Sequence, residues 1–300
     1  MPATPVDQLW QIASTRWTQI GAKSPDLAPA LALQQALLRI SIGASVRIED
    51  ADIPGVPVEA MPGKWRRGLP AFRNEIVPIP QHLKDGLTAL CGILSEGGAG
   101  DSALHIGRAV AAGDIDAGSL LSVSLARNHK AIRTSALHMG FSPDLLWLIG
   151  DLASAPLAHH LRSRLAAAGL DLTGWARGYC PCCGSWPVFI EVLPGSRALR
   201  CSYCAASWEL YARRCVYCGN AGEDFVEAAP DLADKSRRVE LCRACGGYTK
   251  VIQGASPTPA PLLAIEDLAT MDLDQGAMAR GYGRPELQDL DAIDPPSGCP

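Results

Sequence analysis

The chain has 300 residues, of which 48% are hydrophobic and 19% are charged, and its formal net charge is −4. This composition is typical of a folded protein with two or three domains and excludes a largely disordered chain. The net negative charge also argues against a protein whose main task is to neutralise nucleic-acid phosphates.

The N-terminal segment MPATPVDQLW has no basic stretch and no apolar core, so we expect no secretory signal there. The longest runs of consecutive apolar residues, such as LLWLIG, are too short to span a bilayer. We therefore expect a cytoplasmic protein with no membrane insertion. Thiols stay reduced in that compartment, which favours metal ligation over disulfides.

Residues 1–174 show the apolar spacing of helices, and Thr4-Pro5 has the pattern of an N-cap followed by a proline in the first turn. The stretches that we expect to be helical are 6–20, 25–40, 81–95, 102–112, 117–139 and 143–168. The proline-rich segment 52–80 separates them and contains the basic run Lys64–Arg67, which we interpret as a solvated loop. The sequence thus predicts a helical bundle with one long irregular connection.

The helical part shows no sign of a catalytic or metal site. Its histidines have no metal-ligand spacing with a carboxylate, and we interpret them as surface or core residues. These histidines are His82, His105, His129, His138, His159 and His160. Cys91 fits an apolar helix face, so we expect it in the core. No nucleophile elbow, phosphate loop or carboxylate pair is present, and we predict that the protein is not an enzyme and has no small-molecule substrate.

Four C-x-x-C pairs occupy the stretch 180–245, and each pair places two sulfurs on one side of a tight turn. The eight predicted metal ligands are Cys180, Cys183, Cys201, Cys204, Cys215, Cys218, Cys242 and Cys245. Four thiolates form a tetrahedral site that suits Zn²⁺ or a single iron ion. We therefore predict two metal ions per chain, with iron favoured and zinc as the alternative.

The residues between the cysteine pairs predict which pairs share a metal. Strand-like alternation at 188–192, the turn at Pro194-Gly195 and the run RALR form a hairpin between the first two pairs. DFVEA, a polar loop and RRVEL repeat this order between the third and fourth pairs. Each hairpin brings its own two pairs together, so we favour sequential pairing. The alternative is a cross-brace in which alternate pairs share a metal.

Each predicted module has about forty residues, which is too few to bury a stable core without a cross-link such as a metal ion, so we expect the metals to have at least a structural role.

The stretch GASPTPAP follows the second module, and its composition is typical of a linker. An amphipathic C-terminal helix then begins near Leu262, and its acidic residues form a solvated face in our interpretation. We expect the last residues to be disordered and Cys299 to be a free thiol.

The motifs CPCCGSWPV, GSRALRCSYCAASW, RRCVYCGN and VELCRACGGYTK resemble those of the formate dehydrogenase accessory (FdhE) family. The C-terminal DLATMDLD and GYGRP are also similar, whereas the first 140 residues resemble the family only loosely. The resemblance implies rubredoxin-like modules behind a helical domain. It also implies a cytoplasmic assembly factor whose partner is the catalytic subunit of formate dehydrogenase. Cys182 departs from the pattern, and we expect it to point away from the metal.

The predicted fold is α+β and multidomain, with a helical domain at 1–174 and a first four-cysteine metal module at 175–213. A second four-cysteine module follows at 214–254, and a linker, helix and tail at 255–300. Two other functions stay open, namely a rubredoxin-like electron carrier and a zinc-ribbon nucleic-acid binder. The second rests on aromatic and arginine side chains, which are Trp186, Tyr203, Trp208, Tyr211, Arg197, Arg200, Arg213 and Arg214. Charge argues against it, because each all-thiolate site with a divalent ion adds two negative charges.

Overall fold

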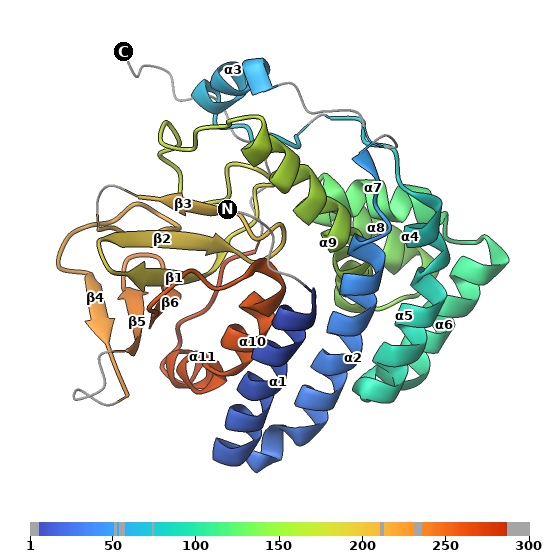
Figure 1. Cartoon of the computed structure of the whole chain (residues 1–300), viewed down its shortest axis with the longest axis horizontal. Helices are drawn as coiled ribbons and strands as arrows, with labels where there is room; N and C mark the ends of the chain where they lie inside the picture. The colour runs from blue at the N-terminus through green and yellow to red at the C-terminus, as the bar shows by residue number, and fades with distance from the viewer. Residues whose placement is uncertain are drawn as a thin grey trace. The chain divides into compact units, whose positions relative to one another are not determined.

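The structure is a computed structural model that describes residues 6–50, 53, 58–73, 75–210, 213–230 and 236–286. The predicted N-cap at Thr4, the tail thiol Cys299 and the expected disorder of the tail lie outside these ranges. The chain forms two compact units (Figure 1). One unit comprises Met1–Val58 and Phe72–Ala168, and the other comprises Glu59–Ala71 and Gly169–Pro300.

The first unit is helical. Its helices are α1 (Val6–Lys23), α2 (Ala28–Ser45), α4 (Gln81–Asp85), α5 (Leu87–Leu94), α6 (Gly100–Ala112), α7 (Ala117–Leu125), α8 (His129–Met139) and α9 (Pro143–Ala167). In α1 the buried residues recur at helical spacing, as predicted for an amphipathic helix. In α9 the buried residues lie around the helix from Leu146 to Leu165, and Pro156 is accommodated inside it. Cys91 is 1% exposed, as expected of a core residue.

The single helix predicted over 117–139 is wrong, because the chain breaks between α7 and α8. Arg127 adopts a left-handed backbone with φ 58°, and the Asn128 side chain accepts a hydrogen bond from the Ala131 N–H at 3.0 Å. The Arg127 guanidinium donates to Asp151 at 2.5 Å and stacks 4.4 Å from the centre of the Trp147 ring. These contacts to α9 stabilise a backbone conformation that apolar periodicity does not reveal.

The segment Pro25–Ser45 has a mean hydropathy of 1.3 and is long and apolar enough, by length and composition, to cross a membrane. Counting only consecutive apolar residues missed this stretch. A buried core helix and a signal sequence near the N-terminus pass the same test, and 11% of this stretch is buried. Within the first unit α2 packs against α5 and α9 and buries Leu31 and Leu38.

The second unit contains a six-stranded sheet. Its strands are β1 (Pro187–Leu193), β2 (Ser196–Cys201), β3 (Ser207–Glu209), β4 (Phe225–Ala228), β5 (Arg237–Cys242) and β6 (Gly247–Gln253). The strand order is β3-β2-β1-β6-β5-β4. Both predicted hairpins are present as antiparallel pairs, and the turn at Gly195 has the positive φ of 82° that glycine permits. The predicted class, helices followed by two small β modules with four cysteines each, is confirmed.

The two modules share this sheet, because β1 of the first pairs in parallel with β6 of the second. Ile190 lies opposite Val251, and both side chains are fully buried. Parallel pairing of strands far apart in sequence leaves no local signal, so tandem motifs alone did not reveal a common sheet. The domain boundaries predicted at 174, 213 and 254 stay a prediction.

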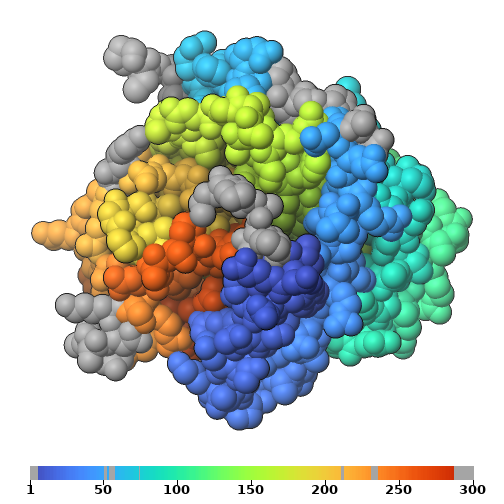
Figure 2. Space-filling view, viewed as in Figure 1, coloured from blue at the N-terminus to red at the C-terminus, as the bar shows by residue number. Residues whose placement is uncertain are grey.

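Two short helices, α10 (Leu263–Leu268) and α11 (Met271–Met278), pack on one face of the sheet. In Figure 2 their orange-red surface lies beside the yellow surface of the first module. The single C-terminal helix that we predicted is interrupted near Thr270. The Thr270 hydroxyl donates to the carbonyl of Glu266 at 2.9 Å, and Lys250 Nζ donates to that of Asp267 at 2.9 Å. Side-chain donors to the last carbonyls of a helix favour its end.

The solvated face that we predicted for the acidic residues of these helices holds for the exposed Asp272 but is wrong for Asp267 and Asp274. Lys250 is fully buried in β6, and its ammonium lies 2.5 Å from an oxygen of Asp267 and 2.7 Å from one of Asp274. Arg284 adds a contact of 3.1 Å to Asp274. The carboxylates therefore neutralise a buried lysine that the sequence pattern of the helix alone could not show.

The predicted linker is also anchored on the sheet. Thr258 donates its backbone N–H to Glu191 at 2.8 Å, and its carbonyl accepts from Arg200 at 2.7 Å. Glu191 and Arg200 form a buried ion pair with each other. The predicted linker therefore supplies hydrogen-bond partners to the buried polar side chains of β1 and β2.

Candidate metal centres

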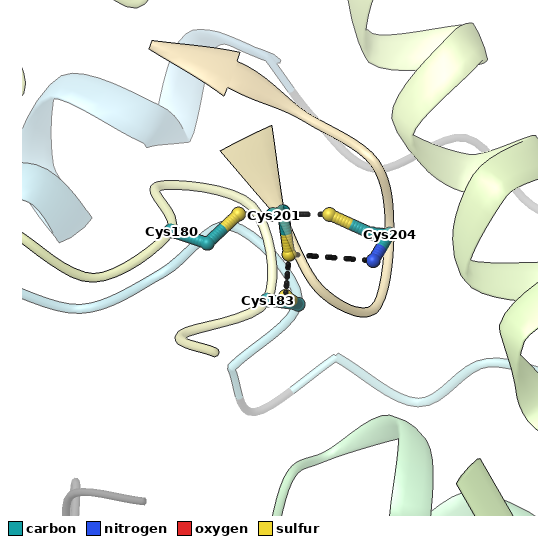
Figure 3. A group of neighbouring side chains, drawn as sticks. All are labelled: Cys180, Cys183, Cys201 and Cys204. Carbon is teal, nitrogen blue, oxygen red and sulfur yellow. Dashed lines mark hydrogen bonds between the residues drawn. The ribbon is translucent and has the colours of Figure 1, made fainter. Parts of the chain in front are cut away.

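The first group of four thiols forms at one end of the hairpin β1–β2. The Cys180–Cys183 turn precedes β1, the Cys201–Cys204 turn follows β2, and the register places Pro187 opposite Cys201. The sulfurs of Cys180 and Cys204 lie 3.5 Å apart, and those of Cys183 and Cys201 lie 3.4 Å apart. Figure 3 shows the side chains of the two loops converging on one point. All four sulfurs lie within 4.8 Å of one another.

The second group repeats this arrangement around the hairpin β4–β5. The sulfurs of Cys215 and Cys245 lie 3.7 Å apart, and those of Cys218 and Cys242 lie 3.6 Å apart. These four sulfurs also lie within 4.8 Å of one another. The structure thus groups the thiols sequentially, as the internal hairpins predict, and a cross-brace does not occur among them.

Both groups have the size of a tetrahedral metal site. A zinc–sulfur bond of about 2.3 Å places the sulfurs of a regular tetrahedron about 3.8 Å apart. The four measured separations of 3.4–3.7 Å are close to this value. Four thiolates can bind either Zn²⁺ or a single iron ion, so the geometry fits both predicted ions and does not distinguish iron from zinc.

The backbone of the four turns explains how they present their sulfurs. In three of them the first cysteine donates its N–H to the carbonyl five residues ahead, as in the 2.9 Å bond from Cys180 to Ser185. The residue after the second cysteine has a positive φ in every turn. These residues are Gly184 (90°), Ala205 (59°), Gly219 (77°) and Gly246 (69°). The glycine after C-x-x-C is therefore a sequence signal for this turn, and Ala205 adopts the same conformation at a steric cost.

Backbone N–H groups point at the sulfurs of the first group. Cys201 Sγ accepts from the N–H of Tyr203 at 3.3 Å and from that of Cys204 at 3.4 Å. Such donors stabilise a thiolate. Burial raises the pKa of the Cys180 and Cys204 thiols well above the ordinary value. A bound cation would offset this cost and favour the deprotonated form of these two thiols, which ligation needs.

Cys182 is buried but belongs to neither four-sulfur group. Its N–H donates to Cys180 Sγ at 3.4 Å, and its thiol adds to the effect of burial in raising the pKa of Cys180. The prediction that it points away from the metal stays a prediction, because its side chain interacts with the thiols of both Cys180 and Cys204. Its thiol lies close to the site.

Within the described residues, the two cysteine groups are the sets of ligand side chains that come together, and no histidine belongs to either. His82 lies 3.2 Å from the carbonyl of Ala44, and His160 lies 2.9 Å from Asp50. His105 and His129 contact the rings of Phe141 and Trp147. These contacts are those expected of surface and core residues rather than ligands.

The side chains that suggested nucleic-acid binding do not form a stacking platform. Trp186, Tyr203 and Trp208 are each at most 8% exposed. Four arginines are held by carboxylates or carbonyls, with Arg197 bound to Glu240, Arg200 to Glu191, Arg213 to Glu227 and Arg214 to the carbonyl of Ala176. Tyr211 lies outside the described residues. Bases need exposed rings for stacking, which the three described aromatic residues do not offer.

Sequence reasoning missed a segment that covers the first group. The run Lys64–Arg67 is not a solvated loop, because helix α3 (Met61–Arg66) includes most of it and Lys64 Nζ donates to the carbonyl of Ala71 at 2.8 Å. Residues Glu59–Ala71, hereafter the covering segment, belong to the same compact unit as the sheet. The Ala71 N–H donates to the carbonyl of Pro181 at 2.8 Å, which fixes the segment to the first turn.

Fold and site together define a class of protein, namely a helical unit followed by two four-cysteine modules that share one sheet. A crystal structure of the FdhE protein from Pseudomonas aeruginosa has this fold, with a TM-score of 0.58, 19% identity and coverage of 98% of both chains. Curated FdhE homologues match part of the sequence. One from Aquifex aeolicus is 31% identical over 160 residues, and one from Shewanella baltica is 35% identical over 159 residues.

The chain spans about half the length of these two relatives, 53% and 52%. FdhE of Escherichia coli is 24% identical over 225 residues, which cover 74% of this chain and 69% of that protein. No protein-family model matches the sequence. The chain is similar in sequence to FdhE homologues over about half its length and in fold to an FdhE protein over 98% of it, and the resemblance inferred from the cysteine motifs is confirmed.

Proposed function

We propose that this protein is an accessory protein for formate dehydrogenase, acting in the cytoplasm on the catalytic subunit during its maturation, and that it is not itself an enzyme. The observation that carries the proposal is the pair of four-cysteine groups on a shared sheet in a chain similar to FdhE proteins. The names of these relatives identify the FdhE family, and the client and the compartment are inferences from it.

We also propose that each four-cysteine group holds one metal ion, iron or zinc. The sulfur separations support this, and so does the burial of thiols that are costly to deprotonate without a cation. An ion in each group would tie a C-x-x-C turn before a hairpin to one after it, and so stabilise the small β modules. Elemental analysis of anaerobically purified protein tests the number of ions, and a visible absorption spectrum separates coloured iron(III)–thiolate from colourless zinc.

A pull-down from cytoplasmic extract tests the client. We expect the tagged protein to recover the catalytic subunit of a formate dehydrogenase and the purified protein to have no formate-oxidising activity. A protein of unrelated fold with the same tag serves as the control. Recovery of no formate dehydrogenase subunit, from either reduced or oxidised protein, would refute the accessory function.

Redox sensitivity is the finer part of this proposal. Iron in a thiolate site changes its charge by one on oxidation, and a coupling of about 1–3 kcal/mol would make client release depend on redox state. The exposure of Cys218 and Cys245 supports electron exchange at the second group. The same exposure favours a rubredoxin-like electron carrier as the second candidate function. Equal client recovery with reduced and oxidised protein would remove the redox switch alone.

A further inference from the structure

The two four-cysteine groups differ in their access to solvent. Cys180, Cys183, Cys201 and Cys204 are at most 3% exposed. In the second group Cys215 and Cys242 are buried, but Cys218 and Cys245 are exposed. Gly219 and Arg243, beside the second group, are exposed as well. The motifs are alike in sequence, so this difference arises from what packs over each pair of turns.

The covering segment Glu59–Ala71 packs over the first group. Besides the bond from Ala71 to Pro181, the Tyr179 hydroxyl donates to the carbonyl of Gly68 at 2.8 Å. The rings of Trp65 and Trp175 lie 6.0 Å apart, and Trp175 Nε1 donates to the carbonyl of Tyr179 at 2.7 Å. These contacts hold the segment against the residues that lead into Cys180.

The second group is contacted by a different segment, because the Gly283 N–H donates to the carbonyl of Gly246 at 2.9 Å, beside the fourth turn, but this contact leaves two of its cysteines exposed. The chain before it does approach closely, because a Cβ on Gly178 would lie 1.7 Å from the carbonyl oxygen of Val216. That contact lies on the inner side of the third turn, next to the buried Cys215. The outer sulfurs, those of Cys218 and Cys245, stay open to solvent.

We propose that the second four-cysteine group is an exchangeable metal site and that the first retains its ion. This inference rests on the metal binding proposed above. An incoming ligand reaches an exposed thiolate site directly and replaces one sulfur at a time. Each displaced thiolate takes up one proton from water, and no electrons are transferred. At the first group the same exchange needs local opening of the covering segment, which lowers its rate.

The test uses the full chain loaded with zinc and the chelator 4-(2-pyridylazo)resorcinol in excess. We expect two phases of one ion each, and the slow phase to be at least about tenfold slower, because it waits for local opening. Alkylation with iodoacetamide, followed by peptide mass spectrometry, should modify Cys218 and Cys245 before any cysteine of the first group.

Variants assign the phases. Cys218→Ser should remove the fast phase, and Cys183→Ser should remove the slow one. Trp65→Ala and Tyr179→Phe touch no ligand sulfur, yet they should accelerate the slow phase and leave the fast phase unchanged. Arg66→Ala, at an exposed position of the same helix, is the matched control and should change neither phase.

Release of both ions at one rate, or loss of the fast phase in Cys183→Ser, would overturn the inference while leaving metal binding intact. Slow release that is unchanged in both Trp65→Ala and Tyr179→Phe would overturn the role of the covering segment. Failure of the chain to hold either zinc or iron would instead overturn the proposed metal binding, and with it the inference.

Discussion

Lys250 shows at the residue scale how a buried charge organises the C-terminal helices. Its ammonium is fully buried and contacts both Asp267 and Asp274, whereas Arg237 and Asp272 form an exposed pair at 2.9 Å nearby. Lys250→Met should lower the free energy of unfolding by about 2–4 kcal/mol, because it removes the buried cation nearest to two partly buried carboxylates and leaves them only the more distant Arg284. Urea denaturation, followed by circular dichroism, measures this loss.

Arg237→Met is the matched control for Lys250→Met. It removes a basic side chain that also contacts α11 but lies at the surface, so it should cost less than about 1 kcal/mol. Equal decreases in the free energy of unfolding of the two variants would show that the buried lysine contributes no more to stability than the surface arginine. Neither change touches a cysteine, so metal content should stay the same in both.

At the scale of the element, each hairpin assembles its own four-cysteine group. Cys201→Ser should therefore lose one metal ion and keep the other, because its sulfur belongs to the first group alone. Cys182→Ser, which removes a buried thiol outside both groups, should keep the full metal content. Elemental analysis by plasma mass spectrometry measures both. Loss of both ions from Cys201→Ser would indicate that the groups are coupled, and the shared β1–β6 pair is where that coupling would pass.

At the scale of the whole molecule, charge and packing both argue against nucleic-acid binding. The formal net charge is −4, and three aromatic candidates for stacking are buried. We expect any binding to mixed single- and double-stranded oligonucleotides to be no tighter than about micromolar at physiological salt. Fluorescence anisotropy measures this affinity, and salt-sensitive binding in the nanomolar range would contradict the expectation.

The sequence by itself determined the local features of this protein. The spacing of C-x-x-C pairs, the strand alternation at 188–192, the turn at Pro194-Gly195 and the repeat of this order predict both hairpins and the sequential grouping of the thiols. These features depend on residues less than about thirty positions apart, and backbone geometry alone relates such patterns to structure. The start of α9 at Pro143 was predicted in the same way, because Ser142 followed by a proline is a typical pattern for the first residues of a helix.

The tertiary structure alone decided the remaining features. The pairing of β1 with β6, the neutralisation of Lys250 by α10 and α11, and the return of residues Glu59–Ala71 to the sheet all join distant segments. Such contacts have no periodicity, because they depend on the burial of particular polar groups rather than on the repeat of a helix or strand. The same reason explains the different exposure of the two cysteine groups. Their motifs are alike, but residues Glu59–Ala71 pack against the first group, whereas the contact of Gly283 with Gly246 leaves Cys218 and Cys245 of the second group exposed.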